Sequence, residues 1–173
     1  MIETITHQGN KYPKFQSEGF AAKFIFPVAR EVCVGRGCDI GCNRPEWAFV
    51  DRTGKCAIMV DPIIDPQFDA YKLPEGEFDY LFSSHCLEHL RDWVGALDYW
   101  ETKLKAGGTL FLYLPHFNQS YWRPWFNRKH THCLDPVIIQ NYLIDRGWNN
   151  VFVTGADMNS SFAVMAEKPK DVL

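Results

Sequence analysis

The chain has 173 residues, of which 46% are hydrophobic and 15% aromatic, and its 18 basic and 21 acidic side chains give a net charge of −3. A chain of this length buries roughly two thirds of the surface that it exposes when unfolded, which is enough for one core, so we expect a single domain over residues 1–173. The acidic balance and the lack of a Lys/Arg block argue against nucleic acid as the main partner.

The first fifteen residues, MIETITHQGNKYPKF, contain neither a signal peptide nor an apolar span. We therefore expect a cytoplasmic protein without a membrane segment. Six cysteines lie mostly inside apolar runs, and we expect them to be reduced core thiols. They are Cys33, Cys38, Cys42, Cys56, Cys86 and Cys133. Because Cys38 and Cys42 lack the CxxC spacing and no second pair exists, the cysteines predict no metal site.

The first predicted element is a helical entry segment over residues 1–30, ahead of a core over residues 31–173. The pattern of residues 18–33 predicts a helix interrupted at Pro27. A short buried strand follows in RGCDIGC, residues 36–42. The next stretch, RPEWAFVDR, predicts a short helix, because Pro45 would lie near its first turn, where a missing N–H costs little.

Three further strands are predicted in KCAIMVD, FDYLFSS and TLFLYLP, at residues 55–61, 78–84 and 109–115. Between the last two, residues 85–108 predict one amphipathic helix that is stopped by Gly107 and Gly108. Its apolar positions recur at spacings of three and four: Leu87, Leu90, Val94, Leu97, Trp100 and Leu104.

The last predicted helix starts at Asp135, a capping residue, and ends at Gly147. Two closing strands follow, in residues 148–155 and 161–168. Strands that alternate with helices predict a three-layer α/β sandwich with a mainly parallel sheet. In that architecture ligands bind at the carboxyl ends of the strands.

Two strand ends carry residues suited to a nucleotide-like ligand. Gly41 and Asn43, around Cys42, follow the first buried strand and permit close approach of the backbone to a ligand. A helix after them would direct free N–H groups at an anion. Asp61 ends the next strand, where a carboxylate can accept both hydroxyls of a ribose. Ordinary turns would explain the same residues, since Asp is also common ahead of a proline such as Pro62.

Five motifs occur in order along the chain. They are DIGC at residues 39–42, VDP at 60–62, DAYKLP at 69–74, FDYLFSSHCLEHL at 78–90 and LKAGGTLFLYLP at 104–115. Together they resemble the class I S-adenosylmethionine-dependent methyltransferases of the type 11-like group, over about residues 37–168. The resemblance implies a Rossmann-like fold with a closing antiparallel strand, and S-adenosylmethionine as the cofactor.

The resemblance also implies which residues hold the cofactor. The methionine part would lie against Asp39, Gly41, Cys42 and Asn43. The ribose would lie at Asp61 and Pro62, the adenine along Asp69, Ala70 and Leu73, and the sulfonium next to Ser84 and His85. Two features depart from the pattern. Asn43 stands where relatives usually have glycine, and the short spacing from Asp61 to Asp69 predicts a reduced or missing helix.

The letters HCLEH, with His85, Glu88 and His89, also match an inverted zinc-protease pattern. We predict no metal here, because the pattern begins in the first turn of the predicted helix and no later acidic third ligand is evident. A zinc metallopeptidase therefore remains a distant alternative.

Methyl transfer is an in-line displacement, so a general base is needed only if the acceptor must lose a proton. The candidates are His85, after the fourth strand, and His116, after the fifth; each could instead be a hydrogen-bonding strand-end residue. Residues 117–133 form an aromatic and basic loop that would close over an acceptor or pack under the fold. His130 and His132 would face a common site only if that stretch is extended.

The fourth strand ends in SSHC rather than an Asp/Asn-Pro-Pro-aromatic motif, and no Pro-Cys is present, which argues against DNA methylation. We expect O-methylation of a small-molecule or carbohydrate-derived acceptor. A non-catalytic module that binds S-adenosylmethionine is the alternative. The short chain also leaves room for a homodimer in which the partner subunit completes the acceptor site.

Overall fold

The structure is a computed structural model that describes residues 3–7 and 9–170. Its centre is a six-stranded sheet of order β4-β3-β5-β6-β8-β7. The strands are β3 (Gly37–Ile40), β4 (Ile58–Val60), β5 (Phe78–Ser84), β6 (Leu104–Pro115), β7 (Asn149–Val153) and β8 (Ser161–Glu167). Strands β3, β4, β5 and β6 run parallel to one another, whereas β8 pairs antiparallel with both β6 and β7. The predicted mainly parallel sheet and its closing antiparallel strand are confirmed.

Helices cover both faces of the sheet and complete the three layers. One face packs against α3 (Trp93–Lys103) and α4 (Pro136–Asp145), and the other against α2 (Phe26–Val32). Strand β6 shows why: Leu110 and Leu112 point to the first core, while Phe111 and Tyr113 point to the second. A strand that is buried on both faces needs a continuous apolar run, which is how β6 reads in the sequence.

The N-terminal segment differs from the prediction. Strands β1 (Thr4–His7) and β2 (Asn10–Pro13) pair antiparallel as a hairpin, with Gly9 in the left-handed region at φ 79°. Its β-branched residues and the turn glycine favour strands, so the expected helical character of residues 1–30 is wrong there.

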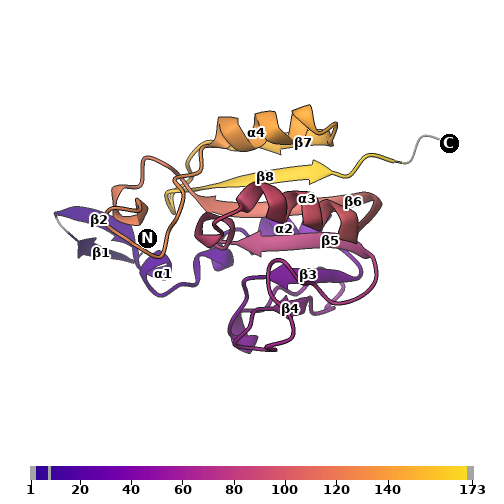
Figure 1. The fold of residues 1–173 in the computed structure, drawn as a ribbon. Coiled ribbons are helices and arrows are strands. Elements are labelled where there is room, and N and C mark those ends of the chain that lie inside the picture. Colours follow the sequence, from indigo (N-terminus) through magenta and orange to yellow (C-terminus); the bar gives the residue numbers. More distant parts are fainter. Residues whose placement is uncertain (1–2, 8, 171–173) are drawn as a thin grey trace.

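Short helices begin only after the hairpin. They are α1 (Lys14–Ser17), the 3₁₀ turn η1 (Ala21–Phe24) and α2. Pro27 opens α2 instead of interrupting a longer helix, because its missing N–H is tolerated in a first turn. Figure 1 shows the hairpin and the loop after β6 at the end of the sheet toward which β5 points.

Two predicted helices are shorter than expected. In residues 44–52 only the 3₁₀ turn η2 (Pro45–Trp47) forms. The helix predicted over residues 85–108 is split into the 3₁₀ turn η3 (Leu87–His89) and α3, whose N-cap Asp92 accepts a hydrogen bond from the Gly95 N–H. Gly107 and Gly108 lie inside β6, since α3 already ends at Lys103.

The connection between β4 and β5 is reduced, as the spacing predicted. Among the described residues it holds turns and one isolated bridge between Asp69 and Lys72, with no helix. The 3₁₀ turn η4 (Ser120–Trp122) lies in the loop after β6. All six cysteines are free thiols, but Cys56 and Cys133 are exposed and not in the core. No helix among the described residues is long and apolar enough to cross a membrane.

Candidate active site

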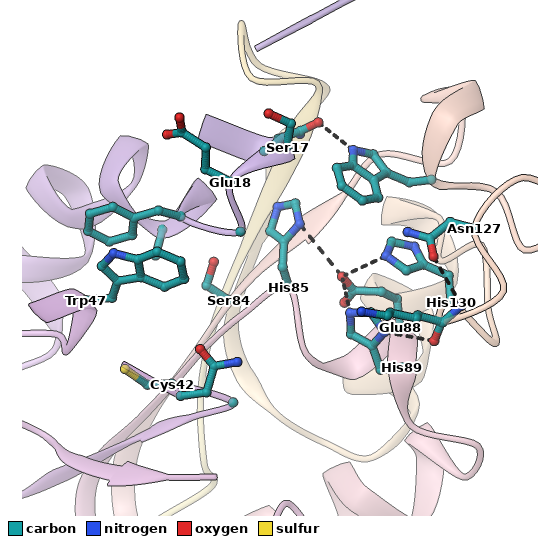
Figure 2. A pocket seen from close by; sticks show the side chains of 18 of the residues that line it. Ser17, Glu18, Cys42, Trp47, Ser84, His85, Glu88, His89, Asn127 and His130 are labelled. Atoms are coloured by element: carbon teal, nitrogen blue, oxygen red, sulfur yellow. Dashed lines mark hydrogen bonds and ion pairs between the residues drawn. The ribbon is translucent and has the colours of Figure 1, made fainter. Parts of the chain in front are cut away.

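A cavity of about 580 Å³ lies at the carboxyl ends of β3 and β5. The sequence predicted six of its lining residues, namely Asp39, Gly41, Cys42, Asn43, Ser84 and His85. The rest come from the N-terminal segment around α1, the turn η2, the turn η3 and the loop after β6. Figure 2 shows Cys42, Ser84, His85 and Glu88 along one wall, with Trp47 and Glu18 on one side and Asn127 and His130 on the other.

The turn after β3 brings the backbone close to this cavity. Gly41 has φ 91°, and a Cβ atom there would lie 2.6 Å from Cβ of Cys86, so only glycine fits. Its N–H donates a 2.8 Å hydrogen bond to the carbonyl of Val60, which joins the tip of β3 to the tip of β4. Asn43 is not among the described non-glycine residues with positive φ, so its departure from glycine imposes no backbone strain.

Asp39 is buried at the end of β3 and faces the cavity wall. Its Oδ2 accepts a 2.8 Å hydrogen bond from the Phe49 N–H. Burial raises the pKa of the Asp39 carboxyl to about 7, against the opposing effect of that hydrogen bond. A positive charge bound in the cavity would favour ionisation of this group.

The structure does not bring the other five predicted cofactor residues into this cavity. Asp61, Pro62, Asp69, Ala70 and Leu73 are not among its lining residues. Asp61 and Asp69 accept from the N–H groups two residues ahead, as in ordinary Asx turns. Leu73 is 2% exposed and packs in the core, so its side chain offers no surface to an adenine ring.

Asp61 nevertheless adjoins a residue that is bonded to Gly41 in the cavity lining. It follows Val60 directly, and the Val60 carbonyl is bonded to the Gly41 N–H. The backbone of Ala70 is fixed against α3, since its carbonyl accepts a 2.7 Å hydrogen bond from the Trp100 indole.

The two predicted catalytic histidines lie apart. His85 lines the cavity in a left-handed conformation, with φ 50°, and its Nε2 is 3.0 Å from Oγ of Ser161. Burial lowers the pKa of His85 to about 3, so its imidazole is neutral at neutral pH. His116 is not a lining residue: its Nδ1 lies 2.7 Å from Oδ1 of Asn118, and its ring meets the edge of Phe162.

Three histidines, one of them His85, surround one buried carboxylate. Oε1 of Glu88 lies 3.7 Å from Nδ1 of His85, 3.8 Å from Nε2 of His89 and 4.0 Å from Nε2 of His130. Figure 2 shows the three rings directed at Glu88. Burial raises the pKa of Glu88 to about 8 and lowers that of His130 to about 4. His130 and His132 do not share a site, because the His132 ring bonds to the carbonyl of Arg91.

The aromatic and basic loop after β6 contributes to the cavity wall. The predicted alternative in which this loop closes over an acceptor required such a position. Its lining residues are Trp122, Phe126, Asn127, Lys129 and His130. The opposite wall was not predicted: Phe20 stacks on Trp47 with ring centroids 5.0 Å apart, and the Arg44 guanidinium lies 4.3 Å from the Trp47 ring centroid. The aromatic and basic residues in the stretch 44–47 were a sequence signal for this wall, but we interpreted that stretch as a short helix.

Comparisons with known proteins agree with this fold. A family model described as a methyltransferase domain matches residues 14–153. The structure is similar to a SAM dependent methyltransferase from Archaeoglobus fulgidus, with a TM-score of 0.64, 17% identity, and coverage of 91% of this chain and 100% of the other.

Two other solved structures are similar at comparable levels. One is the N-methyltransferase NodS from Bradyrhizobium japonicum WM9 in complex with S-adenosyl-l-homocysteine, with a TM-score of 0.61, 16% identity, and coverage of 90% and 88%. The other is the methyltransferase in complex with the Trm112 methyltransferase activator of Haloferax volcanii, with a TM-score of 0.60, 12% identity, and coverage of 89% and 94%. A search of curated proteins found no match.

The similarity to solved structures supports the fold, and the family model covers most of the chain. We therefore set aside the metallopeptidase alternative. The chain belongs to the methyltransferase domain family and is a class I S-adenosylmethionine-dependent methyltransferase.

Proposed function

We propose that this enzyme methylates a hydroxyl oxygen of a small, polyhydroxylated acceptor, such as a carbohydrate-derived metabolite. The observation that carries the proposal is the cavity itself, which runs from the turn at Gly41 to a wall of aromatic and polar side chains. Its volume of about 580 Å³ suits a small molecule.

The residues near the turn fit S-adenosylmethionine. Close approach of a cationic ligand requires a backbone position without a Cβ atom and a carboxylate that faces the ligand. Gly41, where a Cβ would clash, and the buried Asp39 meet these requirements. We propose that Asp39, Gly41, Cys42 and Asn43 hold the methionine end, and that Arg44 pairs with its carboxylate. When bound, the cofactor supplies an electrophilic methyl group next to Ser84 and His85.

The adenosyl half would lie outside the enclosed cavity, on the surface beside β4. There Asp61 would accept the ribose hydroxyls, with Pro62 next to it, and Asp69 and Ala70 would border the adenine. The backbone bond between Gly41 and Val60 supports this placement, because it joins the two strand tips.

The two side walls of the cavity are suited to a hydroxyl-rich acceptor. Four aromatic side chains, Phe20, Trp47, Trp122 and Phe126, offer apolar faces to the carbon skeleton. Between them lie polar side chains that can donate to or accept from hydroxyls, namely Ser17, Glu18 and Asn127.

His85 is the residue that we propose to contact the acceptor hydroxyl. Its ring is neutral, so a nitrogen can accept the hydroxyl proton as the oxygen attacks. With a pKa of about 3 it is a weak base, and its main contribution is to orient the oxygen. His116 remains a predicted catalytic residue from sequence only, since it does not line the cavity.

The test is a labelled-methyl assay against pooled small metabolites, with Asp61→Ala as the control enzyme. We expect label in a sugar-like fraction, and a methyl ether in the NMR spectrum of the product. Methylation of an amine nitrogen would refute the O-methyl assignment. Label transfer no faster than in the Asp61→Ala control would favour a non-catalytic module. Light scattering of the same sample tests for the predicted homodimer.

A further inference from the structure

Glu88, His89 and His130 direct three metal-ligating atoms toward one point on the cavity wall (Figure 2). Nε2 of His89 and Nε2 of His130 lie 3.8 and 4.0 Å from Oε1 of Glu88, and all three atoms are within 4.8 Å of one another. These separations are too long for hydrogen bonds. The two distances from Oε1 exceed the spacing of about 3.3 Å between neighbouring ligands of a tetrahedral zinc ion by less than about 1 Å, and the 4.8 Å limit exceeds it by about 1.5 Å.

The Glu88 carboxyl group has no hydrogen-bond partner that would explain its burial. Glu88 is 0% exposed, and neither of its side-chain oxygens has a hydrogen-bond partner among the described residues. A buried, unpaired carboxyl group is costly, and native proteins normally pair such groups or use them to bind metal. A cation at this point would satisfy the group.

The histidines are held in the orientation that a metal requires. Nδ1 of His89 lies 2.8 Å from the carbonyl of Lys129, which can only accept, so Nδ1 carries the proton. In the neutral ring the Nε2 lone pair then faces Glu88. Metal-binding histidines usually donate their second N–H to a carbonyl in this way.

The loop that carries His130 is fixed against η3 by its backbone. The N–H groups of Thr131 and His132 both donate to the carbonyl of Glu88, at 2.8 and 3.2 Å. Trp122 also stacks on the His130 ring, with centroids 5.2 Å apart and planes at 11°. The three ligating groups are therefore pre-positioned, although His130 is far from Glu88 in the sequence.

We propose that Glu88, His89 and His130 bind one divalent transition-metal ion, with zinc as the probe. Two imidazoles and one carboxylate suit zinc, iron or cobalt better than magnesium or calcium, which prefer oxygen ligands only. The sequence pattern lacked a third ligand, and the fold supplies it as His130, so this proposal replaces our expectation of no metal.

Three protein ligands leave a fourth position, as in catalytic zinc sites. His85 lies beside it, with Nδ1 3.7 Å from the same carboxylate oxygen. Because the cluster lines the cavity in which we place the acceptor, the ion would take an acceptor oxygen as its fourth ligand and lower the pKa of that hydroxyl. This role rests on the proposed function, whereas metal binding itself does not.

The experiment titrates Zn²⁺ into metal-free wild-type protein, without cofactor or acceptor. The same titration follows for Glu88→Gln, His130→Asn and the control His132→Asn. His132 lies on the same loop, but its ring donates to the Arg91 carbonyl outside the cluster. We expect one equivalent of zinc to bind to the wild type and the control, and an affinity lower by about a hundredfold or more in the other two variants.

Folded wild-type protein that takes up no zinc would overturn the proposal, as would Glu88→Gln and His130→Asn variants that bind as tightly as the wild type. If those variants do not fold, X-ray absorption of the zinc-loaded wild type decides: two imidazole ligands support the site and none overturns it. Zinc binding without methyl transfer would leave the site standing and refute the proposed function. Methyl transfer by a protein that binds no zinc would refute the metal site and leave the proposed function standing.

Discussion

The N–H of Gly41 donates a 2.8 Å hydrogen bond to the carbonyl of Val60. This bond joins the turn after β3 to the end of β4, so that the proposed methionine-binding residues and Asp61 start from one fixed point. The proposed cofactor site depends on this connection, since its two halves come from segments that are otherwise separated by the loop of residues 42–57.

Replacing Gly41 with alanine should disrupt this turn. The new Cβ would lie 2.6 Å from Cβ of Cys86, and φ 91° is unfavourable for any other residue. We expect the free energy of unfolding to fall by about 1 to 3 kcal/mol. Affinity for S-adenosylhomocysteine, measured by calorimetry on the folded fraction, should fall at least about tenfold. Gly155→Ala is the matched control, because a Cβ there meets open space and its φ is not in the left-handed region; equal losses in both variants would contradict the account.

Asp39 should make stability and cofactor affinity depend on pH in opposite directions. Its pKa is about 7 in the folded protein, against an ordinary value of 3.8 for an exposed Asp, so the folded state retains a proton that the unfolded state loses between these values. Stability from this group is therefore complete below about pH 4 and is lost as pH rises through 7. Relative to Asp39→Asn, the wild type should lose roughly 4 kcal/mol over that range.

A cationic cofactor prefers the ionised carboxylate, so its affinity should rise with pH up to about 7 in the wild type and stay flat in Asp39→Asn. Calorimetry at several pH values measures this, and denaturant titrations at the same values measure the stability. Parallel pH profiles for the two proteins would show that Asp39 is ionised throughout.

His85→Asn should separate catalysis from cofactor binding. Asparagine tolerates the left-handed backbone at φ 50°, so the fold should be retained. Loss of the imidazole should lower turnover about a hundredfold, while affinity for S-adenosylhomocysteine changes little. Single-turnover kinetics and calorimetry check the two quantities. Unchanged turnover would remove His85 from the proposed mechanism.

Gln16 should be a major stabilising contact of the N-terminal segment. It is 2% exposed, and its side chain donates to Ser161 Oγ and to the Asn159 carbonyl and accepts a 2.6 Å bond from the Trp122 indole. Gln16→Leu would leave these groups unsatisfied and should cost about 2 to 4 kcal/mol in urea unfolding. Exposed Gln67→Leu should change stability by no more than about 0.5 kcal/mol. Similar values for both would mean that the network contributes little.

The sequence predicted the centre of the sheet well because its inner strands are buried on both sides and read as unbroken apolar runs. FDYLFSS coincides with β5, and Asp135 caps α4 as expected. The N-terminal hairpin was missed because four-residue strands have little periodicity. The break before α3 was missed because the apolar residues keep a helical spacing across residues 85–90. That spacing does not indicate the left-handed backbone at His85.

The sequence pointed to cavity-lining residues where they are local in the chain, and it missed those that come from distant segments. The residues directly after β3 and β5 line the cavity. In contrast, Gln16 and His130 reach it from segments more than forty positions from His85, and such a meeting depends on tertiary packing. His116 follows a strand just as His85 does, but its ring turns toward Phe162.

The most direct test compares Asp61→Asn with Asp65→Asn in calorimetry with S-adenosylhomocysteine. Both carboxylates accept a 2.9 Å hydrogen bond from the N–H two residues ahead, so the two substitutions alter the same kind of turn. Only Asp61 adjoins the strand tip that is bonded to Gly41. We predict that Asp61→Asn weakens binding about tenfold or more while Asp65→Asn binds like the wild type. Equal binding by the two variants, or no binding by the folded wild type, would contradict the proposed cofactor site.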